Sequence, residues 1–130
     1  MATSLRPLHA AVFAKLSASP VLAGRVYAKV PEPAPYPLVS IGSITEIPDD
    51  QHDAQGLDVL LVIHVWAKGS SVGPAYDLMA AVDEALDRVA LTVAGFTEVR
   101  IRLEQAQAIE DPDPEITHIN ARFRVHMTKE

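Results

Sequence analysis

The stretch VLLVIHVWAKG, Val59 to Gly69, decides the predicted fold. Positions 59, 61, 63 and 65 are apolar on one parity, and Leu60, Val62 and Trp66 are apolar on the other. Successive side chains of a strand point to opposite faces, so both faces of this strand carry apolar groups. We expect a central strand. One face should pack on helices, and the other should meet a second copy of the chain or the proline segment folded over it.

The residues after this strand change from strand to helical period. In SSVGPAYDLMAAVDEALDRVA one stripe holds Tyr76, Met79, Val82, Leu86 and Val89, which predicts an amphipathic helix. A similar stripe predicts a first helix over residues 5–18, with Ser4 before it as the N-cap.

The remaining chain reads as strands. Residues 26–30 and 38–47 precede the central strand, and two more strands flank the acidic turn EDPDPE. Short links without crossover helices favour antiparallel pairing. The prediction is an α+β fold in the order α-β-β-β-α-β-β. A mainly antiparallel sheet of about five strands carries both helices on one face, within a single domain spanning residues 1–130.

Composition excludes several classes of protein. The chain has 130 residues, no cysteine and a formal charge of −6. There is therefore no disulfide framework and no thiol nucleophile, and an acidic protein is poorly suited to gripping a phosphate backbone. No apolar run approaches the roughly 20 residues of a membrane helix. We expect a soluble protein that is not secreted and has no membrane partner.

No motif for catalysis is present. GSSVG lacks the lysine of a nucleotide-binding loop and the spacing of a nucleophile elbow. We expect no enzyme and no cofactor. His64, His118 and His126 lie on predicted strands and could meet across a sheet, so a small metal-binding or ligand-binding enzyme domain stays as an alternative.

The arginines form the most informative cluster. A hairpin through EDPDPE would place Arg100 and Arg102 beside Arg122 and Arg124 on one face. Like charges across a strand pair repel, so carboxylates must interleave with them. Glu98, Glu104 or other residues of the same chain could supply them.

A second copy could supply the carboxylates instead, in a heterologous contact of the kind that closes rings. Its source would be the Asp111–Glu115 turn or the Asp49–Asp53 loop, and a phosphate contact is a third option. The candidate interface residues are Arg100, Arg102, Arg122, Arg124, Asp49, Asp50, Asp53, Asp111, Asp113 and Glu115.

Alternate prolines also predict a stiff arm or connector, made of Pro31, Pro33, Pro35, Tyr36 and Pro37.

Four segments carry a resemblance to a known family. They are LRPLHAAVFAKLSASPVLA, GRVYAKVP, PYPLVSIG and LLVIHVWAKGSSVGPAYDLMAAVDEALD. In this order they resemble the tail terminator or tail-completion proteins of long-tailed phages and phage-derived gene transfer agents. The resemblance implies a small α+β subunit and a hexameric ring. Such a ring caps the tail tube, stops its polymerisation and presents the surface that joins the head. It implies no catalysis.

The resemblance also implies the partners. They are other copies of the chain, the tail tube protein, and head–tail connector or stopper proteins, with DNA passing through the ring without sequence-specific binding. The expected location is the head–tail junction of a particle made in the bacterial cytoplasm. A minor tail or neck component of the same particle is the alternative.

Overall fold

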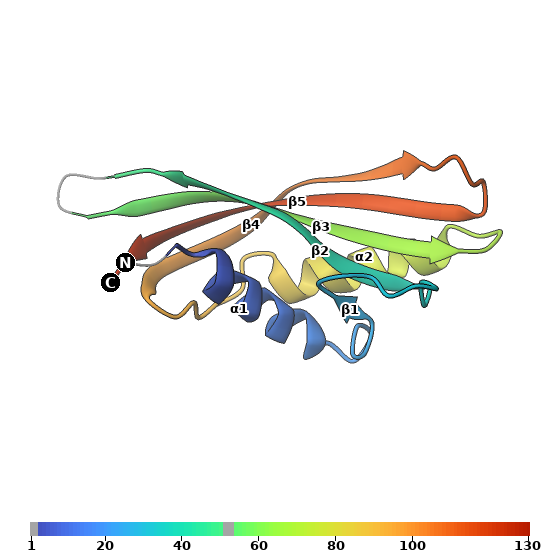
Figure 1. The fold of residues 1–130 in the computed structure, drawn as a ribbon, viewed down its shortest axis with the longest axis horizontal. Helices are drawn as coiled ribbons and strands as arrows, with labels where there is room; N and C mark the ends of the chain where they lie inside the picture. Colours follow the sequence, from blue (N-terminus) through green and yellow to red (C-terminus); the bar gives the residue numbers. More distant parts are fainter. Residues whose placement is uncertain (1–2, 51–53) are drawn as a thin grey trace.

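The computed structural model describes residues 3–50 and 54–130. Its elements are α1 (Leu5–Ser17), β1 (Val26–Tyr27), β2 (Leu38–Pro48), β3 (Gly56–Lys68), α2 (Gly73–Leu86), β4 (Phe96–Glu110) and β5 (Ile116–Lys129). The strands form one sheet in the order β1-β2-β3-β5-β4, in which β1 is parallel to β2 and the other pairings are antiparallel. Both helices lie on one face of this sheet (Figure 1). The predicted α+β fold class and element order are confirmed.

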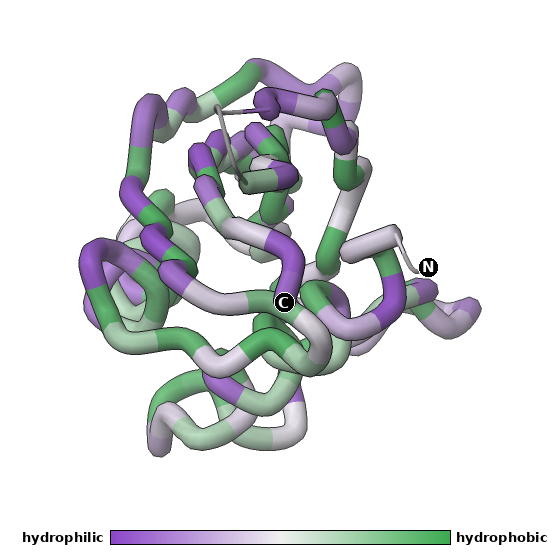
Figure 2. Tube along the Cα trace, turned by 90° about the vertical axis from the view of Figure 1, so that its left-hand side faces the viewer, coloured by the Kyte–Doolittle hydropathy of each residue, from purple (hydrophilic) through white to green (hydrophobic). Residues whose placement is uncertain are grey.

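The two-sided apolar strand lies at the centre of the sheet. β3 pairs with β2 on one side and with β5 on the other. Its odd-numbered residues from Leu57 to Ala67 are at most 3% exposed, whereas its even-numbered residues from Gly56 to Trp66 are only half-buried. Figure 2 shows hydrophilic and hydrophobic residues following one another in short segments along the chain. One face of β3 therefore belongs to the core, and the other is left partly open to solvent.

The helices cover the core face as the spacing requires. The fully buried residues of α1 are Leu8, Val12 and Leu16. The stripe predicted for α2 was partly wrong, because Tyr76 is 50% exposed and Val89 lies beyond the end of the helix. Val82 and Leu86 of the predicted stripe are buried, and the buried side of α2 is completed by Ala75, Leu78 and Ala81. Alanine has no long side chain, so this side lets the helix approach the sheet closely.

The edges of the sheet differ from the predicted strands. β1 ends at Tyr27 instead of continuing to Val30, because the chain turns away into the proline segment. At the other edge β4 is long, and residues 104–110 are exposed on both faces. Within the described residues, neither helix is both long and apolar enough to cross a membrane.

Candidate assembly surface

The face of the sheet opposite the helices is the candidate functional surface, and we call it the open face. It carries the even-numbered side chains of β3 from Asp58 to Trp66 and those of β5 from His118 to His126, which lie opposite one another in register. Of the described elements, no helix lies on this side (Figure 1). Apolar groups at Leu60, Val62 and Trp66 remain half-buried there. A surface of this kind suits contact with another protein.

A cluster of aromatic rings lies at one end of the open face. The indole of Trp66 stacks on His118 with 3.7 Å between ring centroids and an interplanar angle of 8°. Nδ1 of His64 lies 2.9 Å from Nε2 of His118, and Trp66 Nε1 donates to the hydroxyl of Ser40 at 3.3 Å. Three strands, β2, β3 and β5, are thus tied together by side chains on their exposed side.

Gly42 makes room for this cluster. It lies at the irregularity of β2 between Ile41 and Ile44, and a Cβ placed on it would come within 2.7 Å of Nε2 of His64. The histidine ring therefore covers the glycine backbone, a way in which sheets shield a residue without a side chain.

Burial of the two histidines favours their neutral forms. Desolvation lowers the pKa of His64 below its ordinary value. Desolvation also lowers the pKa of His118, as does the neighbouring His64, while Asp111 acts in the opposite direction. A hydrogen bond between two imidazoles requires a donor and an acceptor, so the pair is compatible with neutral rings.

The three-histidine alternative receives partial geometric support. His64 and His118 meet, but His126 lies opposite Asp58 towards the other end of the strands, with 3.7 Å between Nδ1 and Oδ1. Among the described residues no group of three or more His, Asp or Glu side chains is placed to hold a metal ion. The predicted meeting of His64 and His118 is therefore confirmed, whereas the predicted meeting of His126 with them is wrong.

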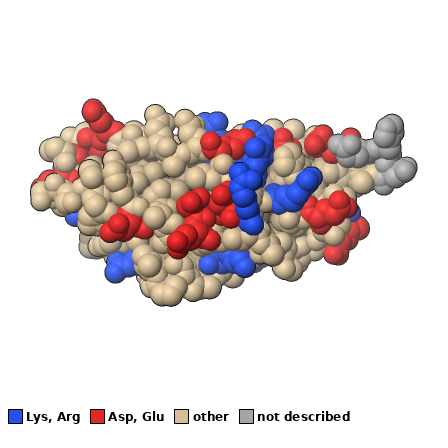
Figure 3. Space-filling model, turned by 180° about the vertical axis from the view of Figure 1, so that it is seen from behind, with Lys and Arg blue, Asp and Glu red and all other residues tan. Residues whose placement is uncertain are grey.

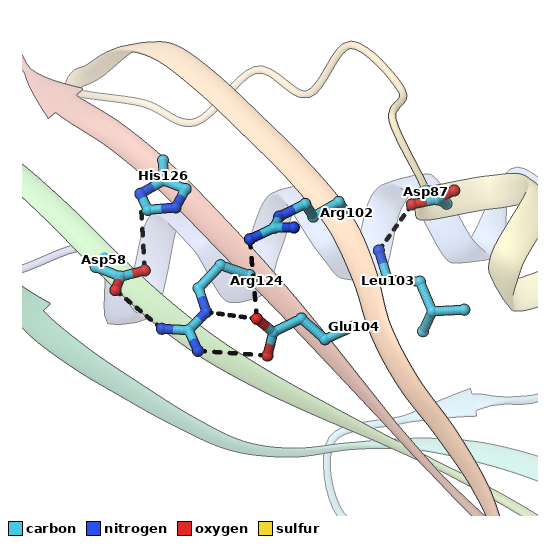
Figure 4. A network of polar contacts seen from close by, with 7 residues as sticks. All are labelled: Asp58, Asp87, Arg102, Leu103, Glu104, Arg124 and His126. Atoms are coloured by element: carbon cyan, nitrogen blue, oxygen red, sulfur yellow. Dashed lines mark hydrogen bonds and ion pairs between the residues drawn. The ribbon is translucent and has the colours of Figure 1, made fainter.

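The arginine hairpin forms as predicted, and Arg102 lies directly opposite Arg124. Arg124 donates from Nη1 to Oδ2 of Asp58 at 2.9 Å and from Nε to Oε2 of Glu104 at 3.1 Å (Figure 4). Arg102 reaches the same Glu104 oxygen at 4.0 Å. These contacts, above all the hydrogen bond to Glu104, raise the pKa of Arg124. Carboxylates of the same chain therefore neutralise this part of the cluster.

The sequence predicted Glu104 as a carboxylate that neutralises the arginine cluster. It did not predict Asp58, which reaches Arg124 from the adjacent strand β3. The other expected carboxylate, Glu98, forms no ion pair with any described residue, and it lies at an irregularity of β4 with a φ of 53°.

The other two arginines stand apart from this network. Arg100 lies opposite His126, and Arg122 lies opposite Gln105. Neither forms an ion pair among the described residues. A hollow of about 770 Å³ opens beside Arg100 and runs past the strand edge. Its lining residues are Asp49, Arg88, Val89, Ala90, Val99, Arg100, Ile101, Arg102, Arg124 and His126.

The predicted acidic residues separate into two groups. Asp49 lines the arginine hollow of its own chain and Asp50 is exposed beside it, while Asp53 lies outside the described residues. Asp111, Asp113 and Glu115 form the turn between β4 and β5 at the far end of the sheet (Figure 1). The two acidic segments that the sequence offered as alternative partners of the arginines therefore lie far apart, and their role at an interface stays a prediction.

The proline segment links β1 to β2. Its backbone is fixed at Tyr36, whose N–H donates to the carbonyl of Ala34 at 3.0 Å, and at Pro37, whose carbonyl accepts from Arg25 at 3.4 Å. Pro31, Pro33 and Pro35 are exposed. The geometry is that of a connector, and a role as an arm stays a prediction.

Comparison with known proteins connects these features to a family. Residues 10–128 match the family model described as Tail completion protein gp17. The chain is 35% identical over 94 residues to the Tail completion protein gp17 of Bacillus phage SPP1, which covers 71% of this chain and 69% of that protein. A chain in the solved structure "Virion of native gene transfer agent (GTA) particle" has the same fold, with a TM-score of 0.87 at 24% identity. That match covers 98% of this chain and 99% of the other.

The family match and the relative from phage SPP1 define a structural protein of phage tails. More specifically, the chain belongs to the family of tail completion protein gp17. The resemblance inferred from the sequence is thereby confirmed.

Proposed function

We propose that this chain forms a ring, most simply a hexamer, at the end of the tail tube. In this position it stops tube polymerisation and presents the surface to which the head is joined. The family match over residues 10–128 is the observation that carries the proposal, because completing a tail requires a component at its end. The related protein of phage SPP1 is named a tail completion protein.

The shape of the chain supports a role through contacts with other proteins. The open face leaves Leu60, Val62 and Trp66 half-buried, and β4 offers a free edge beyond Leu103. Natural proteins usually protect long strand edges, so an exposed edge of this length favours a partner. Both features are consistent with a subunit that is complete only in an assembly.

The charge of the chain supports a passage for DNA. At −6 the protein as a whole repels a phosphate backbone, and Arg124 is neutralised by Asp58 and Glu104. A ring of such subunits would let DNA move through without sequence-specific binding. Membership in a family of structural proteins supports the expectation that no catalysis is involved.

Particles made without this protein test the proposal. Electron microscopy should then show tails of uncontrolled length or tails that fail to join heads, and supplying the chain in trans should restore joined tails of uniform length. Joined tails of normal length in its absence would refute the proposal. A defect limited to another step, with tail length and joining unchanged, would favour a minor tail or neck component.

A further inference from the structure

Two charged features of the chain are candidates for contact with another copy. The first is the hollow beside β4, where Arg88, Arg100, Arg102 and Arg124 meet and Asp49 is the one acidic lining residue among those described. The second is the Asp111–Glu115 turn. Figure 3 shows Lys and Arg side chains gathered near the middle of the molecule's long axis, with acidic groups on both sides and at the ends.

The hollow keeps unused positive charge. Arg124 is engaged by Asp58 and Glu104. Arg100 forms no ion pair with a described residue, and Arg88 makes only a 3.5 Å contact with its neighbour Asp87 while its side chain stays 76% exposed. The hollow therefore presents Arg88 and Arg100 as its available cations.

The backbone holds these two arginines in place. The N–H of Arg88 donates to the carbonyl of Ile101 at 2.8 Å, and Oδ1 of Asp87 accepts from the N–H of Leu103 at 2.7 Å. The segment after α2 is thus fixed along the edge of β4. Because the backbone that carries these side chains is fixed before a partner arrives, less backbone conformational entropy is lost on binding.

The acidic turn is equally well ordered. Oδ1 of Asp111 accepts from the N–H of Asp113 at 3.0 Å, and Oδ1 of Asp113 accepts from the N–H of Glu115 at 2.9 Å. The carbonyl of Glu115 accepts from the N–H of Gly69 at 2.8 Å. Within residues 3–50 and 54–130, one carboxylate oxygen of each aspartate and both carboxylate oxygens of the exposed Glu115 have no hydrogen-bond or ion-pair partner.

The turn cannot reach the hollow of its own chain. Asp111 lies nine positions after Arg102, just past the end of β4, which corresponds to roughly 30 Å at about 3.3 Å per residue. A contact between the two features therefore has to join different copies. Because the two surfaces differ, the contact is heterologous, and repeated contacts of this kind close into a ring when the rotation allows.

We propose that the Asp111–Glu115 turn of one copy docks into the arginine hollow of the next, with Arg88 and Arg100 as its main partners. This inference rests on the proposed ring and specifies its subunit contact. It also narrows the candidate interface, since Arg124 is neutralised within its own chain and Asp49 belongs to the hollow itself.

Cysteine pairing gives a direct test, because the chain contains no cysteine. Arg88→Cys combined with Glu115→Cys should give disulfide-linked multimers in purified particles under mild oxidation. Each single variant should give at most non-specific dimers. Absence of linked multimers in particles that contain the double variant would overturn the inference.

Charge reversal gives an independent test. Arg88→Glu with Arg100→Glu should reduce the yield of particles with joined heads and tails at least tenfold. Adding Glu110→Arg with Glu115→Arg should restore a substantial part of this yield. Asp111 and Asp113 are left intact because their side chains shape the turn. Arg6→Glu with Lys29→Glu makes the same change in net charge elsewhere and should have little effect.

The outcomes separate this contact from the proposed function. Loss without rescue would mean that the hollow binds DNA or another protein, and would overturn the inference while leaving a tail-end role intact. If the cysteine variant gives linked multimers, but particles made without the chain still carry complete, joined tails, the proposed function is refuted and the contact between copies stands.

Discussion

Replacing Gly42 by alanine should loosen the aromatic cluster of the open face. The added Cβ would lie 2.7 Å from Nε2 and 2.8 Å from Cδ2 of His64, and 3.0 Å from the carbonyl oxygen of Val62. Ordinary carbon contacts lie at about 3.5–4.0 Å. Gly42 does not have a positive φ, so the backbone accepts alanine and the cost is steric.

The size of the effect follows from what must move. The His64 ring has to leave its position, which breaks its 2.9 Å hydrogen bond with His118, worth about 1 kcal/mol. Overpacking a well-filled site costs about 1–3 kcal/mol in total. We therefore expect Gly42→Ala to lower the free energy of unfolding by about 2 kcal/mol. For a chain of this length that corresponds to a fall in Tm of about 6–10 °C.

Denaturant and thermal unfolding of the purified chain would measure this change. Gly73→Ala is the matched control, because its Cβ meets only the Ser71 hydroxyl at 3.3 Å and alanine is favoured in a helix. In a His64→Ala background the cost of Gly42→Ala should fall below about 1 kcal/mol. A neutral Gly42→Ala, or an equal cost in both backgrounds, would refute the packing argument.

Three further predictions concern polar contacts. Ser4→Ala should cost about 1–2 kcal/mol in denaturant unfolding, because the buried hydroxyl donates to Oε1 of Glu46 at 2.6 Å and ties α1 to β2; an unchanged midpoint would contradict this. Asp87→Ala should cost about 1–2 kcal/mol by releasing the N–H of Leu103, whereas Asp87→Asn, which keeps an acceptor oxygen, should cost less. Stability should also fall with acidification: burial lowers the pKa of His64, so the folded state binds fewer protons than the unfolded one. Stability present above about pH 6.5 is then lost as the pH falls below that value and through the lowered pKa of the folded state, and a His64→Gln variant should show a shallower pH dependence in thermal melts.

Much of the fold could be predicted because its signals are local. The doubled apolar pattern of β3 identified a central strand, and the charged turn after Glu110 identified the β4–β5 hairpin. The helix stripe was harder, because Tyr76 and Leu78 lie on nearly opposite sides of the helix, so both sides look apolar. Only packing against the sheet decides that the side with Ala75 and Ala81 faces inward.

The candidate surface was predictable only in part, because it depends on strand register. Neither the pairing of Asp58 with Arg124 nor the stack of Trp66 on His118 follows from spacing within one strand. Arg88 was missed for another reason. Its backbone has a φ of 57° and bonds to the edge of β4, and no periodic pattern signals such a segment.

A reconstruction of the head–tail junction of the assembled particle tests the central claim most directly. We predict a closed ring of this chain between the last ring of the tail tube and the head connector, with the Asp111–Glu115 turn of each copy beside Arg88 and Arg100 of the next. A junction that lacks this chain, or that holds it as isolated copies away from the end of the tube, would contradict the account.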